Sequence, residues 1–281
     1  SASNGMRYVF FGTPNFAARI LQDLINAGMP PALVVANPDK PAGRKKILTA
    51  PETKVLAQKY NIPIYQPEKP TAIAPELSGE WDFFIVCAYA KIIPTEIIKI
   101  PRRGVLGVHP SLLPKYRGAS PIQSAILGGE SKTGITLYLL DEKVDHGDIL
   151  ASNEIPITPG DTHITLSDKL AKLSSELLIK TLPDFLNDKI KSRPQNHDEA
   201  TFTKKFSTND GLLDLKKDDP AIMHKKIRAL NPEPGVYAFI EKSGKQIRTK
   251  ILGANLTDGK LTILRIQEEG KKPVAINLPI F

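Results

Sequence analysis

Short, uninterrupted apolar runs alternate with longer amphipathic segments through the first half of the chain, and this alternation constrains the fold more than any other feature. The run RYVFFG is followed directly by TPNFAARILQDLINAG, in which Ile20 and Leu24 share one side of a helix that Thr13 can cap and Gly28 can end. Similar apolar runs are PALVVANP, IPIY, FFIVCAYA and GVLGVH. Strands that are apolar along their whole length and alternate with helices are typical of a parallel sheet covered on both faces, so we predict an α/β, Rossmann-like domain.

The second half of the chain has a different character. GITLYLL and GDILASNEIPI predict two strands joined by the turn DEKVDHGD, and a long amphipathic helix follows them. Beyond a polar stretch, GVYAFI, QIRTKILGA, KLTILRIQ and PVAINLPI are short strands at regular spacing, which is typical of a small, OB-like β-barrel. We therefore predict an N-terminal α/β domain over residues 6–187, a linker over 188–203 and a C-terminal β-barrel domain over 204–281.

Positive charge is concentrated near the end of the chain. From Lys204 onward there are 15 Lys and Arg against 9 Asp and Glu, so this part carries a net +6 of the formal +8. Such an excess suits an acidic partner, although a modest lysine surplus is also common on solvated surfaces.

Cysteine usage and hydropathy favour a cytoplasmic protein. Cys87, the single cysteine, lies in an apolar run and has no partner for an internal disulfide, which fits a buried thiol in a reducing compartment. The N-terminal SASNG has neither the basic start nor the apolar centre of a signal peptide, so we read the protein from Met6. No apolar run has the length needed to cross a bilayer.

Several common cofactor motifs are missing from the sequence. The first strand-to-helix turn, FFGTPNF, holds one glycine where a dinucleotide-binding turn has three, and there is no phosphate-binding G-x-x-x-x-G-K-[ST] loop. The five histidines show no zinc-type spacing, so we predict no metal site.

One histidine and one aspartate remain as candidates for acid–base chemistry. His109 precedes Pro110, which favours an extended backbone, so His109 is expected to end its strand at the carboxyl edge of the sheet, where ligands bind. Asp145 lies in the VDHGD turn. From position alone, His109 could equally stabilise a loop, and Asp145 could be ordinary turn material.

Six segments carry a resemblance that covers nearly the whole chain. They are, in order, FGTPNFA, NPDKPAGRKK, CAYAKIIP, HPSLLPKYRGASPIQ, VDHGDIL and IRALNPEPGVY. Together they resemble the methionyl-tRNA formyltransferases, a branch of the folate-dependent formyltransferase family. HPSLLPKYRG marks the broad family, which also includes glycinamide ribonucleotide and nucleotide-sugar enzymes, whereas NPDKPAGRKK and IRALNPEPG narrow the resemblance to the tRNA branch.

The resemblance implies that a formyl group moves from 10-formyltetrahydrofolate to the α-amine of methionine on initiator tRNA, in a protein that acts as a monomer. The amine attacks the formyl carbon, so the site must move protons and stabilise a developing negative oxygen. His109 matches the family's catalytic histidine, and Asp145 matches the aspartate that would orient the imidazole and favour its cationic form. The stretch aligned with the tetrahydrofolate site consists of Ser111, Leu112, Leu113 and Pro114.

Basic residues are the expected tRNA contacts. Residues 37–54 are rich in Pro, Gly and Lys and predict a mobile loop. Arg44 matches the family's loop arginine that engages tRNA, and Lys45 and Lys46 adjoin it. Without the resemblance, a solvated basic loop would explain these residues as well. In the C-terminal domain, the positive excess would meet phosphates and orient the tRNA without reading its bases.

Two alternatives stay open, a nucleotide-sugar N-formyltransferase and a degenerate, non-catalytic homologue that binds tRNA or folate. Gly107 supports the second, because the family normally has an asparagine there whose amide donates to the formyl oxygen. Loss of one such donor typically lowers turnover about 100- to 1,000-fold. A water in the space left by the side chain, an introduced substitution or an altered activity would each explain the glycine, and Gly107→Asn should raise the rate if the missing donor is limiting.

Overall fold

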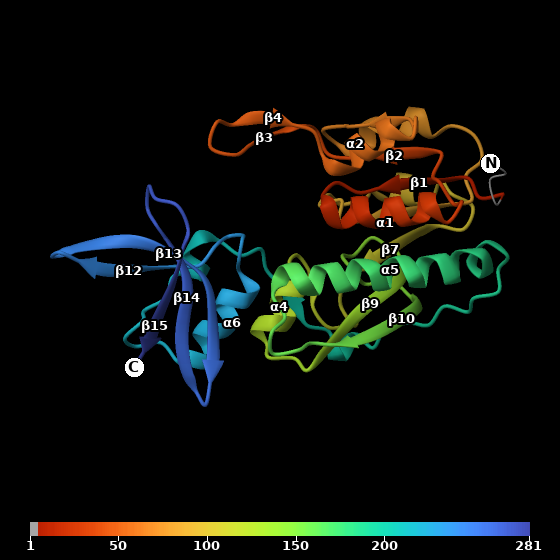
Figure 1. The fold of residues 1–281 in the computed structure, drawn as a ribbon. Helices are drawn as coiled ribbons and strands as arrows, with labels where there is room; N and C mark the ends of the chain where they lie inside the picture. The colour runs from red at the N-terminus through yellow and green to blue at the C-terminus, as the bar shows by residue number, and fades with distance from the viewer. Residues whose placement is uncertain (1–4) are drawn as a thin grey trace. The chain divides into compact units, whose positions relative to one another are not determined.

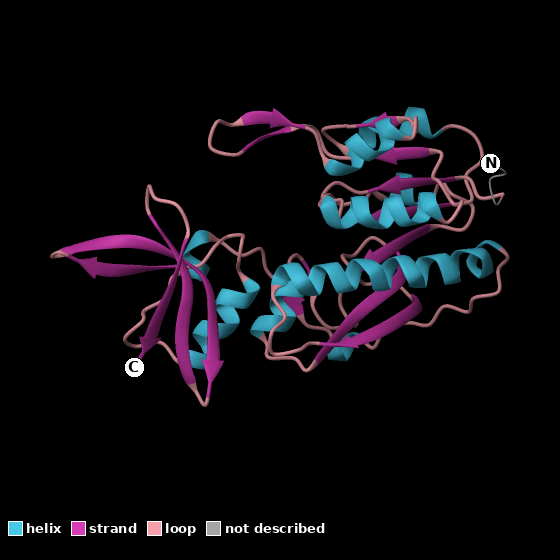
Figure 2. Cartoon of the chain, in the orientation of Figure 1, coloured by secondary structure: helices cyan, strands magenta, loops and turns pink. Residues whose placement is uncertain are grey.

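The computed structural model describes residues 5–281 and divides them into two compact units. The first unit holds the chain up to Arg117 with Gly134–Ile155 and Asp168–Phe202, and the second holds Gly118–Thr133, Pro156–Ser167 and Thr203–Phe281. Figure 1 traces the chain through both units, and Figure 2 separates helices from strands. Each unit gathers several stretches of sequence, whereas the domains expected from the sequence are continuous. We retain those sequence bounds as a proposal for the two functional domains.

The first unit is built on a seven-stranded sheet with the order β10-β9-β7-β6-β1-β2-β5. Its parallel part consists of β1 (Tyr8–Phe11), β2 (Leu33–Val35), β5 (Ile64–Tyr65), β6 (Phe83–Cys87) and β7 (Val105–His109). The edge beyond β7 consists of β9 (Lys132–Leu139), which pairs antiparallel with β7, and β10 (Ile149–Pro156). The predicted α/β class is therefore confirmed, with a sheet that is parallel over five strands and mixed at this edge.

The helices and shorter elements account for most of the remaining chain. They are α1 (Asn15–Asn26), α2 (Glu52–Lys59), η1 (Pro70–Leu77), α3 (Thr95–Ile98), β8 (Arg117–Gly118), α4 (Pro121–Leu127), α5 (His163–Leu186), η2 (His197–Glu199), β11 (Phe202–Thr203), η3 (Thr208–Gly211) and α6 (Pro220–Ala229). Helix α1 confirms the first predicted helix, and Gly28 follows it with a φ of 75°, the left-handed conformation that ends many helices. Thr13 does not cap α1, because its hydroxyl accepts the backbone N–H of Asn37 at 3.1 Å. Among residues 5–281, no helix is both long enough and apolar enough to cross a membrane.

The central strands are buried on both faces, as their unbroken apolar sequences predicted. On one face, Val9 of β1 belongs to a cluster of buried side chains that includes Ile97 of α3. On the other face, Tyr8 stacks on Phe83 with ring centroids 4.9 Å apart, and Phe185 of α5 meets Phe83 edge-on at 5.8 Å. Helical elements therefore cover both sides of β1 and β6.

The segment that we expected to be a mobile loop, residues 37–54, contains an antiparallel hairpin. Strand β3 (Lys40–Ala42) pairs with β4 (Ile47–Thr49), and the turn between them holds the basic residues 44–46. Figure 1 shows the hairpin extending away from the rest of its own unit. At the base of the hairpin, the Asp39 carboxylate accepts hydrogen bonds from Gln66 at 2.6 Å and from Lys54 at 3.1 Å. These hydrogen bonds lower the pKa of Asp39 from its ordinary value. Paired backbone groups and this anchored base give the segment more order than its composition suggested.

The second unit contains an antiparallel sheet of four strands in sequence order. They are β12 (Tyr237–Lys242), β13 (Lys245–Thr257), β14 (Lys260–Glu268) and β15 (Val274–Ile280), so all four predicted C-terminal strands are present. The expected barrel takes the form of an open sheet with β12 and β15 at its edges. An OB-type barrel uses five strands to close, one more than this sheet has. Helix α6 packs against β13 and buries Met223 and Ile227.

Candidate active site

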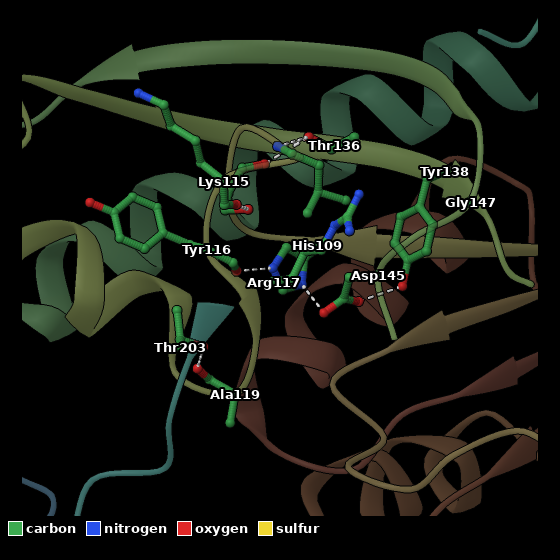
Figure 3. Close-up of polar contacts among 12 residues, drawn as sticks. His109, Lys115, Tyr116, Arg117, Ala119, Thr136, Tyr138, Asp145, Gly147 and Thr203 are labelled. Carbon is green, nitrogen blue, oxygen red and sulfur yellow. Dashed lines mark hydrogen bonds and ion pairs between the residues drawn. The ribbon is translucent and has the colours of Figure 1, made fainter. Parts of the chain in front are cut away.

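His109 is the last residue of β7, at the carboxyl edge of the parallel strands, as the sequence predicted. Its side chain is 8% exposed, and Nε2 lies 2.8 Å from the backbone oxygen of Tyr116. A carbonyl oxygen can only accept, so Nε2 donates this hydrogen bond and carries a proton. The other ring nitrogen, Nδ1, lies 3.6 Å from Oδ2 of Asp145 (Figure 3). The backbone of the following loop therefore fixes the imidazole and turns Nδ1 towards the carboxylate.

Asp145 lies in the turn between β9 and β10 and has a φ of 51°. This left-handed conformation is uncommon outside glycine but is tolerated by aspartate. The Asp145 side chain is 12% exposed, and the hydroxyl of Tyr138 donates to its Oδ1 at 2.6 Å. Its two carboxylate oxygens therefore face different groups, Oδ1 facing the phenol and Oδ2 facing His109. The structure brings together the two residues that the sequence singled out 36 positions apart.

The distance between Nδ1 of His109 and Oδ2 of Asp145 determines what proton chemistry this pair can perform. At 3.6 Å it is longer than a hydrogen bond between nitrogen and oxygen, so the two groups face one another without closing on each other. A neutral His109 with its proton on Nε2 presents an Nδ1 lone pair here, whereas a protonated His109 presents an N–H to the carboxylate. An acid–base pair of this form can accept a proton and return it.

The turn at residues 111–114 follows His109 and is held by its own hydrogen bonds. Ser111 is fully buried, and its hydroxyl donates to the backbone oxygen of Lys115 at 2.7 Å. The hydroxyl of Thr136 donates to the Ser111 backbone oxygen at 2.7 Å and accepts the Leu113 N–H at 3.1 Å. The Ser111 side chain therefore shapes the turn from inside. Leu112 and Pro114 are half-buried, and Leu113 is buried.

Arg117 and Gln195 belong to the surroundings of the site, and the sequence analysis missed both. The Arg117 guanidinium donates to Gln195 Oε1 at 2.9 Å, and the Gln195 amide donates to the backbone oxygens of Asp145 at 2.9 Å and Gly147 at 2.8 Å. Gln195 is 5% exposed, although it lies in the polar stretch that we interpreted as a linker. A glutamine in a polar run has no local signal that it will be buried, so this contact was visible only in three dimensions.

Gly147→Ala is expected to destabilise the turn that carries Asp145. A Cβ at this position would collide with the backbone oxygen of Leu139, which cannot move without disturbing β9. Overpacking of this kind lowers the free energy of unfolding by about 1–3 kcal/mol or more. Urea unfolding measures the effect, with Gly160→Ala as the matched control, because a Cβ at Gly160 has no atom within 4 Å. Equal unfolding midpoints for the two variants would contradict the close packing of this turn.

The remaining predicted site residues lie on a separate element. Arg44, Lys45 and Lys46 are exposed in the turn of the β3–β4 hairpin and are not part of the His109–Asp145 cluster. A cavity of about 430 Å³ along β10 and α5 is lined by none of the predicted site residues. Within residues 5–281, no group of three or more His, Cys, Asp or Glu side chains is arranged to hold a metal ion.

Comparison with known proteins relates this geometry to a family. The family model described as formyl transferase matches residues 6–182. The methionyl-tRNA formyltransferase of Listeria monocytogenes serotype 4a is 39% identical over 239 residues, which cover 84% of this chain and 76% of that protein. The methionyl-tRNA formyltransferase of Thermodesulfovibrio yellowstonii is 40% identical over 284 residues, which cover 94% of this chain and 92% of that protein.

Solved structures agree at the level of the fold. WlaRD, a sugar 3N-formyl transferase whose crystal structure was determined in the presence of dTDP and 5-N-formyl-THF, superimposes with a TM-score of 0.65. The alignment covers 97% of this chain and 98% of WlaRD at 22% identity, so it shows a shared fold alone. The family match and the alignments with the two methionyl-tRNA formyltransferases show that the chain belongs to the formyl transferase family, within its methionyl-tRNA formyltransferase branch.

Proposed function

We propose that this protein transfers the formyl group of 10-formyltetrahydrofolate to the α-amine of methionine esterified to initiator tRNA. The observation that carries the proposal is the convergence of His109 Nδ1 and Asp145 Oδ2 at 3.6 Å, at the carboxyl edge of a parallel sheet. Membership of the methionyl-tRNA formyltransferase branch supports the choice of acceptor.

The two side chains have distinct tasks in this proposal. The attacking amine must lose a proton, and negative charge develops on the formyl oxygen as the new C–N bond forms. The bond from the formyl carbon to the nitrogen of the folate donor then breaks, and that nitrogen takes up a proton as it leaves. His109 keeps its Nε2 proton on the Tyr116 carbonyl, so Nδ1 is the nitrogen that exchanges a proton with the reacting groups. Asp145 orients the ring and stabilises a proton on Nδ1.

The turn at residues 111–114 fits a tetrahydrofolate as an apolar wall. Leu112 and Pro114 are half-buried beside His109, and the hydroxyl of Thr136 fixes the backbone of the turn in advance. Such a site binds a flat ring system by packing and by backbone groups. The hydroxyl of Ser111 is already hydrogen-bonded to the backbone oxygen of Lys115, so we assign Ser111 to shaping the turn. We assign Leu112, Leu113 and Pro114 to lining the folate site.

The hairpin turn is the proposed tRNA contact of the first unit. Arg44, Lys45 and Lys46 are exposed there on a short, ordered element. In the second unit part of the positive charge is neutralised internally, because Lys204 pairs with Asp210 at 2.8 Å and Lys242 with Glu268 at 3.1 Å. The hairpin therefore offers the sharper test of phosphate binding.

A transfer assay tests the function directly. Purified protein is given 10-formyltetrahydrofolate with methionyl-initiator tRNA, and in parallel with a nucleotide-linked amino sugar. We expect formylation of the methionyl-tRNA alone. Formylation of the amino sugar alone would assign the protein to the nucleotide-sugar enzymes. Binding of tRNA without transfer to either acceptor would identify a non-catalytic homologue.

Replacement of the three hairpin cations is expected to weaken tRNA binding and its salt dependence. Each phosphate contact contributes about 0.9 to the slope of log K against log salt, so the Arg44→Ala, Lys45→Ala and Lys46→Ala triple variant should lower the slope by about 2–3. The measurement is the tRNA affinity over a range of salt concentrations. A triple variant with Lys172→Ala, Lys180→Ala and Lys189→Ala on and after α5 is the matched control of equal charge. An equal fall in slope for both would contradict a specific role for the hairpin.

We further propose that the reaction takes place in the cytoplasm and that the protein acts as a monomer. Cys87 is fully buried, and burial raises the pKa of its thiol, which suits a structural cysteine in a reducing compartment. Light scattering after size-exclusion chromatography tests the oligomeric state.

A further inference from the structure

Gly107 lies directly opposite Tyr138 in the antiparallel pair of β7 and β9. Opposite residues of such a pair share one face of the sheet, and so do residues two apart on one strand. Gly107 and Tyr138 are therefore on the same face as His109, whose own cross-strand partner is Thr136. The position before the catalytic histidine on this face holds a glycine, and an aromatic ring from the neighbouring strand covers it.

There is no room for a side chain at position 107 while Tyr138 stays in place. A Cβ built on Gly107 would lie 2.5 Å from both Cε1 and Cζ of Tyr138 and 2.8 Å from Cδ1 of Leu140. Ordinary contacts of this kind begin near 3.4 Å, so the ring would have to move away. The space is filled by the phenol, which argues against a water there, one of the three explanations that the sequence left open for this glycine.

Tyr138 is bound to the candidate catalytic aspartate. The residue is 6% exposed, and its hydroxyl donates to Oδ1 of Asp145 at 2.6 Å. Burial first, and then the nearby Asp145 carboxylate, raise the pKa of Tyr138 well above its ordinary value, so the hydroxyl keeps its proton and acts as a donor. A short hydrogen bond to a charged acceptor is about twice as strong as one between neutral groups.

This hydrogen bond helps to hold the Asp145 carboxylate in the orientation that faces His109. Rotation of the carboxylate by about a quarter-turn around the last side-chain bond would turn its oxygens away from both His109 and Tyr138. With Oδ1 held by Tyr138, Oδ2 is left facing His109 Nδ1 at 3.6 Å. Figure 3 shows Tyr138 and His109 on either side of the carboxylate. Displacement of the Tyr138 ring would therefore change how the Asp145 carboxylate faces His109.

We propose that Tyr138 is a positioning residue of the formyl-transfer site, which aims Asp145 at His109, and that position 107 is glycine because the Tyr138 ring occupies the space of its side chain. The inference rests on the proposed function, because its first readout is the rate of formyl transfer. It also predicts that Gly107→Asn lowers the rate, the opposite of the result expected if a missing donor at this position were limiting.

Tyr138→Phe is the test of positioning, because it keeps the ring and removes only the hydroxyl. We expect kcat to fall about 10- to 100-fold, the range of a hydrogen bond to a charged group, with KM for the folate donor and for methionyl-tRNA within twofold. A residue that serves packing alone would leave kcat unchanged, because phenylalanine fills the same space. An unchanged kcat, or a rise in KM that accounts for the whole loss, would overturn the positioning role.

A double-mutant cycle with Gly107→Ala and Tyr138→Leu tests the claim about space. Gly107→Ala alone is expected to lower both kcat and the urea midpoint, since it displaces the ring. In the Tyr138→Leu background the same substitution should cost clearly less on both readouts, because the ring is gone and only the contact with Leu140 remains. Additive losses would overturn the claim. If the unsubstituted protein transferred no formyl group, the proposed function would fail, while non-additive urea midpoints would still support the exclusion of a side chain at position 107.

Discussion

His109→Ala is expected to lower kcat for formyl transfer about 100- to 10,000-fold, the usual contribution of a positioned acid–base group. Nε2 donates to the Tyr116 carbonyl and Nδ1 faces Asp145, so the variant loses the ring nitrogen to which the proton transfer is assigned. Removal of the ring leaves the hairpin and the second unit untouched. The tRNA dissociation constant should therefore stay within about threefold, measured by filter binding at the same salt concentration.

The control for this variant is His224→Ala. His224 lies on α6, which packs against β13 in the second unit, and it has no place in the proposed chemistry. Its kcat should match that of the unsubstituted protein. If His109→Ala lost rate and tRNA affinity by the same factor, the side chain would be acting in binding and the assigned role would be wrong.

Asp145→Asn is expected to lower kcat about 100- to 10,000-fold while the protein stays folded. Asparagine has nearly the shape of aspartate, and its side-chain oxygen can still accept the Tyr138 hydroxyl, so the turn between β9 and β10 keeps its internal contacts. The negative charge that faces Nδ1 is lost. A proton on His109 would then have no opposite charge beside it, and turnover should fall with little change in KM for either substrate.

Asp141→Asn supplies the matched control from the same turn. Asp141 accepts from the His146 ring at 2.6 Å and from the Lys143 N–H at 2.8 Å, and its side chain is 38% exposed. Its replacement removes one negative charge from the same turn and should change kcat by less than about fivefold, since exposed ion pairs contribute little. Similar losses for the two variants would show that general charge, and not the orientation of His109, limits the reaction.

The two candidate catalytic residues could be predicted from the sequence, but their arrangement could not. Pro110 after His109 indicated the end of a strand, and strand ends in parallel sheets gather ligands, so the location of the imidazole followed from local rules. Tyr138 looked like one more apolar residue of the GITLYLL strand. Its role depends on the register that places it opposite Gly107, and registers between strands distant in sequence are set by the packing of the whole sheet.

Polar residues that make long-range contacts could not be identified from the sequence. Gln195 holds the turn of Asp145 and Gly147 from a segment that reads as a linker, and Thr136 fixes the turn at residues 111–114 from β9. Hydrogen bonds of this kind join residues tens of positions apart and produce no periodic pattern in the sequence. The β3–β4 hairpin was missed because lysine and proline, which make up most of β3, occur both in loops and in exposed edge strands.

The fold class and the order of the main strands along the chain could be predicted from the sequence, because hydrophobic periodicity is a local property of the chain. His109 and Asp145 were singled out by the family resemblance, since position alone left a structural role open for each. Which oxygen of Asp145 meets which neighbour, and why a glycine precedes His109 on the same face, were decided by the tertiary structure. The physical reason is volume: two side chains cannot fill one space, and only the packed sheet shows that the ring of Tyr138 fills the space beside Gly107.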